Sequence, residues 1–182
     1  MARYAIIGLE CSVTKALSRI VARNVSPSLT HRGEGRKPKP YDGHKNIGDA
    51  HNFVQHYSLP YGKRDNYPEP LSEDWDYILI CTRDFWCSMK SKLGTHAKDR
   101  EAAKSQHDKG TDVLRRLAKY DNSYVFSYEA WYVLGEVYMR DFLKQVGVDY
   151  HIQVEEALDV NRKHVKGHPN KTGRSRHHRT SQ

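Results

Sequence analysis

Two short and mostly apolar segments, residues 3–8 and 76–82, are the clearest structural signal along the chain. Runs of this length are typical of strands that are buried on both faces, as in a parallel sheet. Residues 52–57 and 123–128 are further segments of strand type, and Pro60 stops the first of them. The pattern therefore predicts four strands that are well separated along the chain.

Helix-like periodicity follows the first of these strands. The apolar stripe of Leu17, Ile20 and Val21 predicts a helix there, and Ser12 or Thr14 is expected to cap its N-terminus.

Three further segments between and after the strands are helical in character. Residues 85–93 predict one helix. Residues 96–120 are helical but strongly charged, and Gly110 interrupts them, so they predict either two helices or a lid. Residues 130–146 predict a last helix that ends at Gly147. The expected buried face of this last helix consists of Trp131, Leu134, Tyr138 and Phe142.

Strands and helices thus alternate, which predicts an α/β fold with a small, mostly parallel sheet flanked by helices and joined by right-handed crossovers. Ligands of such sheets bind beyond the carboxyl ends of the strands. That rule directs attention to residues 8–15, 56–62 and 82–91.

Charge is distributed unevenly along the 182 residues. The chain has 30 Lys and Arg against 22 Asp and Glu, a formal net charge of +8. Residues 161–182 contain seven of the basic residues and no acidic one, so residues 1–160 are close to neutral. We expect one α/β domain over 1–160 and a basic, disordered tail over 161–182. The tail favours a polyanion such as nucleic acid, and a solubilising extension is the alternative.

Composition also excludes several classes of protein. No apolar run is long enough to span a membrane, and the apolar stretch near the N-terminus is too short for a signal peptide. The three cysteines form no CxxC pair, which indicates a reducing compartment without a structural disulfide. His44, His51 and His56 lack zinc-type spacing, so no metal site is expected. We therefore expect a cytoplasmic protein, in the host cytoplasm for a viral one.

The turn at residues 8–15 is the first candidate site, because it joins a buried strand to a helix. Backbone N–H groups and the helix dipole at such a turn can hold a phosphate. In the pattern G-x-x-x-x-G-K-[ST], Gly8 is in place. Val13 occupies the position of the second Gly in this pattern. Thr14 occupies the position of the Lys, and Lys15 that of the Ser or Thr. The P-loop motif is therefore broken, and an ordinary strand-to-helix turn is the alternative.

This turn nevertheless resembles the donor-binding loop of sulfotransferases, which is roughly G-L-P-R-S-G-T-T. Gly8, Leu9, Ser12 and Thr14 match that loop, whereas Glu10 and Cys11 replace Pro and Arg. In that family the loop holds the 5′-phosphosulfate of 3′-phosphoadenosine 5′-phosphosulfate. The resemblance implies that this donor contacts Gly8, Ser12, Val13, Thr14 and Lys15.

A second motif follows the strand at 76–82. Arg83 and Ser91 have the spacing of the 3′-phosphate motif of sulfotransferases. An Arg offers phosphate a planar fork of donors, and a Ser in the next helix adds a hydroxyl. A local ion pair between Arg83 and Asp84 is the alternative. The resemblance extends over about residues 3–150, and it implies a P-loop sulfotransferase or kinase fold with a helical lid.

The function expected from this resemblance is sulfuryl transfer to a hydroxyl acceptor. His56, in a segment where sulfotransferases often carry a catalytic His, is the first candidate for the base. Lys15 would neutralise phosphate, and Asp42 would approach the same pocket from a loop. Glu10 lies inside the turn, where a carboxylate would repel phosphate unless it binds Mg²⁺ or the acceptor.

Two alternatives remain. A small P-loop kinase would use ATP with Mg²⁺, as Glu10 favours, and would phosphorylate a hydroxyl. Its acceptor could be a hydroxymethylated base in DNA, as in phage-type DNA modification, which would employ the basic tail. The broken P-loop pattern instead favours a non-catalytic module that binds nucleic acid. The acceptor itself is not encoded in a readable motif.

Overall fold

The computed structural model describes residues 2–9, 12–25, 47–48, 52–59, 75–93 and 99–151. The predicted tail at 161–182 lies outside the described residues. The helices and strands, in chain order, are β1 (Ala2–Leu9), α1 (Thr14–Val25), β2 (Ile47–Gly48), β3 (Asn52–Leu59), β4 (Tyr77–Thr82), α2 (Phe85–Leu93), α3 (Arg100–Leu117), β5 (Ser123–Ser127), α4 (Tyr128–Leu134) and α5 (Glu136–Gln145).

The strands form one sheet in the order β2-β3-β1-β4-β5. β1 pairs in parallel with both β3 and β4, β5 extends the sheet in parallel beside β4, and the short β2 runs antiparallel to β3. All four strands predicted from the sequence are present, although β3 is two residues longer than expected. The predicted α/β fold with a small, mostly parallel sheet is therefore confirmed.

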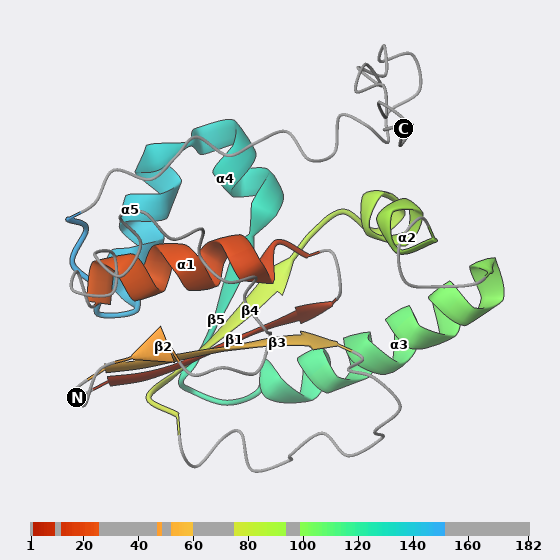
Figure 1. Cartoon of the computed structure of the whole chain (residues 1–182), viewed down its shortest axis with the longest axis horizontal. Helices are drawn as coiled ribbons and strands as arrows, with labels where there is room; N and C mark the ends of the chain where they lie inside the picture. Colours follow the sequence, from red (N-terminus) through yellow and green to blue (C-terminus); the bar gives the residue numbers. More distant parts are fainter. Residues whose placement is uncertain are drawn as a thin grey trace, which may run out of the picture.

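Helices cover both faces of the sheet. Figure 1 shows α1, α4 and α5 on one face and α3 on the other. The chain leaves β1 through α1 to reach β3 on one side, and it leaves β4 through α2 and α3 to reach β5 on the other. The direction of winding thus reverses between β1 and β4. In open α/β sheets a ligand crevice forms at the carboxyl ends of two such strands.

Two apolar cores, one on each face, follow from the alternation of side chains along β1. Tyr4 and Ile6 pack into the core beneath α1, α4 and α5, whereas Ala5 and Ile7 pack into the core beneath α3. All four side chains are at most 2 % exposed. Because β1 is buried on both faces and hydrogen-bonded on both edges, the turn that leaves it is held on a rigid base.

The charged segment at 96–120 differs from its prediction. It contains a single helix of 18 residues, α3, and Gly110 does not interrupt it. A Cβ on Gly110 would lie 3.3 Å from the Leu59 Cβ and would overlap the Leu9 side chain. The glycine therefore allows the helix to lie close against the sheet. The C-terminal half of α3 closes a core. The alternative of two helices is therefore wrong, and the predicted lid stays a prediction.

The predicted helix at 130–146 is also different, because it is divided into α4 and α5. Gly135 separates them with a φ of +59°, a backbone conformation that glycine adopts readily. Because of this break, Leu134 does not belong to the buried face as expected and is 56 % exposed. Trp131 and Phe142 are buried as predicted. The predicted end of the last helix at Gly147 is confirmed, with its φ at +68°.

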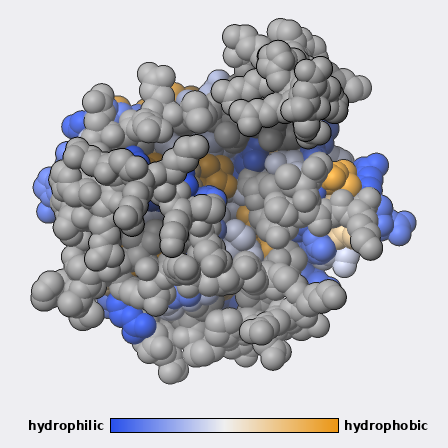
Figure 2. Space-filling view, in the orientation of Figure 1, coloured by the Kyte–Doolittle hydropathy of each residue, from blue (hydrophilic) through white to orange (hydrophobic). Residues whose placement is uncertain are grey.

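Among the coloured residues on the face shown in Figure 2, hydrophilic ones predominate and apolar colour is confined to small areas. The most exposed apolar side chains include Val133 and Val137, beside the break between α4 and α5. No helix in the described ranges is long and apolar enough to cross a membrane.

Candidate functional site

The turn between β1 and α1 has an unusual backbone conformation. Val13 has a φ of +68°, which a β-branched residue rarely adopts and which costs about 1–3 kcal/mol. Val13 stands where the P-loop pattern has its second glycine, so the turn keeps a glycine-type conformation without the glycine. The Val13 carbonyl accepts hydrogen bonds from Ala16 and Leu17 and so begins α1.

The caps predicted for α1 are wrong. The Thr14 hydroxyl lies 2.6 Å from His56 and is not directed to the helix end. The Ser12 side chain makes no hydrogen bond within the described part of the chain. By contrast, α2 and α3 are capped by the carboxylates of Asp84 and Asp99. The first turn of α1 also contains no acidic residue.

Gly8 lets the turn fold back tightly onto the sheet. A Cβ at this position would lie 2.6 Å from the Thr14 Cγ2 and 2.9 Å from the Cys81 carbonyl oxygen, and it would overlap the Ser12 hydroxyl. Carbon atoms do not approach this closely, so no other residue fits without displacing the turn. The glycine that matches both loop patterns therefore has a steric reason to be there.

Ser12 is the residue of the turn whose surroundings most clearly suit a bound ligand. It is only 2 % exposed, and its buried Oγ has no hydrogen-bond partner among the described residues. Leaving a hydroxyl buried and unpaired costs about 1–3 kcal/mol. Ser12 also lines the cavity described below. The arrangement suits a polar ligand atom that completes the hydrogen bonding of this hydroxyl.

His56 lies beneath the turn on β3 and is 6 % exposed. Its Nε2 is 2.6 Å from the Thr14 Oγ1 and 3.1 Å from the Ser58 Oγ. The predicted base and the predicted phosphate turn are thus brought together. However, His56 is not among the residues that line the cavity. Its contacts suit a residue that positions Thr14 better than one that touches an acceptor.

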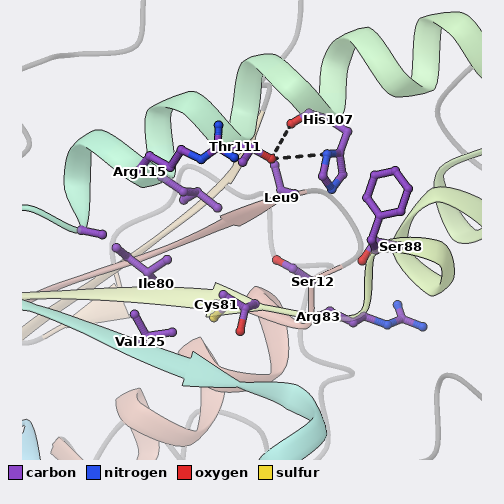
Figure 3. A pocket seen from close by; sticks show the side chains of 14 residues that line it. Leu9, Ser12, Ile80, Cys81, Arg83, Ser88, His107, Thr111, Arg115 and Val125 are labelled. Carbon is purple, nitrogen blue, oxygen red and sulfur yellow. Dashed lines mark hydrogen bonds between the residues drawn. The ribbon is translucent and has the colours of Figure 1, made fainter.

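A cavity of about 350 Å³ opens beside this turn, at the carboxyl ends of β1 and β4 and against α2 and α3. Figure 3 shows the side chains around it. Leu9, Ile80, Leu114 and Val125 make most of its wall apolar. The cavity lies where the winding of the sheet reverses, which is the expected position for a ligand.

Arg83 follows β4 and lines this cavity, and its binding of a 3′-phosphate stays a prediction. Its guanidinium carbon lies 5.7 Å from the centre of the Tyr128 ring. Asp84 is engaged at the end of α2, where its Oδ1 accepts a hydrogen bond of 2.8 Å from the Cys87 N–H. That hydrogen bond is the main reason why the pKa of Asp84 is lowered.

Of the seven predicted donor contacts, Ser12 and Arg83 line the cavity, whereas Gly8, Val13, Thr14, Lys15 and Ser91 do not. Ser91 does not line the cavity, whereas Ser88, nearly one turn earlier in α2, lines it and is 3 % exposed. Lys15 is exposed on the first turn of α1 and does not line the cavity. Glu10 and Asp42 lie outside the described residues.

The contribution of α3 to the cavity was not predicted from the sequence. His107, Thr111 and Arg115 of this helix line the cavity. Gly110 was the available signal, because a glycine inside a helical pattern can mark a close approach to a neighbouring element. The residues one turn before and after a close approach are then brought near the same strand end.

No metal centre is evident in the described ranges, where no three His, Cys, Asp or Glu side chains are placed to hold an ion. Cys81 and Cys87 are both unbridged. Burial raises the pKa of each thiol, so neither is activated as a thiolate.

No protein-family model matches this chain, and comparison with the curated proteins and with the solved structures also gives no match. The function must therefore be argued from the chemistry of the site.

Proposed function

We propose that the protein is a nucleotide-dependent transferase that moves a sulfuryl group from 3′-phosphoadenosine 5′-phosphosulfate to a hydroxyl acceptor. The observation that carries this proposal is the turn from Gly8 to Thr14. It combines a glycine-type backbone at Val13 with a buried, unpaired Ser12 hydroxyl at the start of α1. A phosphate there would accept a hydrogen bond from Ser12 and would face the positive end of the helix dipole.

Arg83 supplies the second anchor. It stands at the end of β4, the strand that pairs with β1, so a ligand across the crevice would meet Ser12 and Arg83 together. A guanidinium binds phosphate through two parallel hydrogen bonds. The carboxylate of Asp84 caps α2, so the N-terminus of α2 is already occupied by an anion. The phosphosulfate is therefore assigned to α1, and the 3′-phosphate to Arg83.

Other residues of the turn have supporting roles. His56 holds the Thr14 hydroxyl and thereby fixes the first residue of α1. Lys15 adds positive charge on the exposed side of the same helical turn. The roles predicted for Glu10 and Asp42, and binding of nucleic acid by residues 161–182, stay predictions.

Isothermal titration calorimetry tests the proposal. The full-length protein is titrated with 3′-phosphoadenosine 5′-phosphate without metal, and separately with ATP and Mg²⁺. We expect the bisphosphate to bind, and Arg83→Ala and Ser12→Ala each to weaken binding by about tenfold, the equivalent of about 1.4 kcal/mol. Arg23→Ala is the matched control, since it removes the same charge from the far end of α1.

Three results would contradict the proposal. Binding of ATP with Mg²⁺ but not of the bisphosphate would replace sulfuryl transfer by the kinase alternative. If neither nucleotide binds, the remaining hypothesis is a non-catalytic module that binds nucleic acid. Equal weakening by Arg83→Ala and Arg23→Ala would show that only net charge matters.

A further inference from the structure

The exposed side of α1 carries positive charge only. Lys15, Arg19 and Arg23 follow one another at intervals of four residues and are all exposed, so they form a row along one side of the helix. We call this row the basic stripe. None of the 12 residues of α1 is acidic. At about 1.5 Å of rise per residue, the stripe extends over about 12 Å of the helix.

The basic stripe differs from the charged faces of the other helices. In α3 the Lys104 ammonium lies 2.7 Å from the Asp108 carboxylate, and in α5 the Arg140 guanidinium lies 2.7 Å from the Glu136 carboxylate. Such pairs four residues apart are typical of a helix face that meets only solvent. Within the described ranges, no ion pair involves a member of the stripe. Its charge is therefore uncompensated there.

This arrangement is unfavourable for the helix itself. Like charges four residues apart repel one another, and Arg19 has such a neighbour on both sides, in Lys15 and Arg23. Lys15 also lies in the first turn of α1, where the helix dipole disfavours a cation. An anionic partner along the helix would relieve both effects. The residues on this side of α1 thus suit binding better than they suit stability.

Two kinds of anionic partner fit α1 poorly. Leu17 and Val21, on the apolar side of the helix, are fully buried in the core, so α1 cannot insert them into a lipid surface. The helix contains no aromatic residue, so it offers no platform on which the bases of a single strand would stack. A partner that presents a dense row of anionic groups without requiring apolar contacts is therefore favoured.

Double-stranded nucleic acid has these properties. It carries one negative charge per about 1.7 Å of its axis, so a length of about 12 Å presents about seven charges to the stripe. Two of the three cations are arginines, whose guanidinium groups bind phosphate oxygens through paired hydrogen bonds.

We propose that the basic stripe of α1 binds the phosphate backbone of double-stranded nucleic acid. This inference goes beyond the proposed function and does not depend on it. It assigns to the folded part of the chain a role that the sequence predicted only for residues 161–182. Because phosphate contacts read no base edges, binding through the stripe should be independent of base sequence.

The salt dependence of binding tests the proposal quantitatively. Fluorescence anisotropy measures the affinity of the full-length protein for a labelled DNA duplex of about 20 base pairs, between about 50 and 200 mM salt. Each neutralised phosphate adds about 0.9 to the slope of log affinity against log salt. We expect the triple variant Lys15→Gln, Arg19→Gln, Arg23→Gln to lower this slope by about 2 to 3 and to weaken binding about tenfold or more at the lowest salt.

A matched triple variant on α3 controls for net charge. It removes one lysine and two arginines from exposed positions on the opposite face of the sheet (Figure 1), as Arg100→Gln, Lys109→Gln, Arg116→Gln. We expect this control to lower the slope by less than about 1.

A reversal of charge separates binding from folding. Arg19→Glu would place a carboxylate four residues from both Lys15 and Arg23, so it should stabilise α1 while it repels phosphate. We expect this variant to unfold at or above the wild-type temperature and yet to bind the duplex about tenfold more weakly or less. Damage to the fold would not give this combination.

Four results would overturn the inference. The first is no binding of the duplex at about 50 mM salt. The second is an equal loss of slope in the two triple variants, which would show that only net charge matters. The third is unchanged binding in the stripe variant, which would leave residues 161–182 as the binding segment. The fourth is tighter binding of a single strand of the same length. None of these results bears on nucleotide binding, so the proposed function is tested separately.

Discussion

At the scale of single residues, two glycines serve different physical purposes. A glycine is required at position 8 for steric reasons, because an added Cβ would lie 2.9 Å from the Cys81 carbonyl oxygen. Gly135 has nothing within 4 Å of such a Cβ but has a φ of +59°. We expect Gly8→Ala to lower the free energy of unfolding by about 2 kcal/mol or more through overpacking. Urea denaturation of the purified variants measures this change.

Gly135→Ala is the comparison for that prediction, since nothing lies within 4 Å of an added Cβ and only backbone strain, of about 1–3 kcal/mol, is expected there. Gly135→Asn should cost about as much, because a φ of +59° with a ψ of −133° lies outside the left-handed helical region that asparagine tolerates. A Gly8→Ala protein as stable as the wild type would contradict the steric account of the turn.

The turn between β1 and α1 was largely predictable from the sequence, whereas the part of the cavity wall formed by α3 was not. Gly8 lies near the end of one buried strand, Ser12 and Arg83 follow two such strands, and parallel strands bring their carboxyl ends together. The spacing of the 3′-phosphate motif selects Ser91, but the sequence does not specify which side of α2 faces inward, and Ser88 lines the cavity instead. Gly110 was the local sign of how α3 is rotated against the sheet, and it does not distinguish a close approach, which would place His107 near the strand ends, from a break in the helix.

At the scale of helices, two glycines illustrate why the ends of helices are hard to predict from the sequence. Gly110 and Gly135 both interrupt helical patterns, yet Gly110 lies inside α3 whereas Gly135 separates α4 from α5. Glycine is compatible with both a helical and a positive φ. Tertiary packing decides between a helical and a positive φ. A Cβ added to Gly110 would contact Leu9 and Leu59, whereas one added to Gly135 would have nothing within 4 Å. The sequence alone does not contain those contacts in a local form.

The close packing of α3 on the sheet leads to a prediction at this scale. Gly110→Val would force side-chain atoms between α3 and the residues Leu9 and Leu59. We expect it to lower the free energy of unfolding by about 2 kcal/mol, as overpacked cores do. Lys109→Val is the matched control, because the same residue enters the same helix at an exposed position. Thermal or urea unfolding distinguishes them, and equal effects of the two variants would contradict the packing argument.

At the scale of the whole molecule, the sheet was the most predictable feature. Continuous apolar runs such as 76–82 predict strands covered on both faces, and in a chain that alternates strand and helix they predict a parallel sheet. Right-handed connections then fix which face each helix covers once the order of the strands is given, but the order itself was not predicted from the sequence. The short β2 was not predicted, since two residues carry no periodicity.

Tyr4 gives a test of how the centre of this fold responds to alkaline pH. It is 2 % exposed in the core beneath α1, and its ring stacks on Tyr77 with centroids 5.0 Å apart. Burial, followed by the nearby Tyr77 and Asp76, raises the pKa of Tyr4 from 10.0 to about 12. Between these two values the unfolded chain releases its phenol proton while the folded chain keeps it, so the stability that is present below pH 10 is lost as pH rises toward 12.

We therefore expect the free energy of unfolding to fall steeply above pH 10, and Tyr4→Phe to make this fall shallower, because phenylalanine keeps the ring and has no proton to lose. Denaturant unfolding followed by circular dichroism from pH 8 to pH 11 measures both curves. Tyr132→Phe is the control, since Tyr132 is 48 % exposed. An unchanged slope in Tyr4→Phe would mean that other groups set the alkaline limit of the fold.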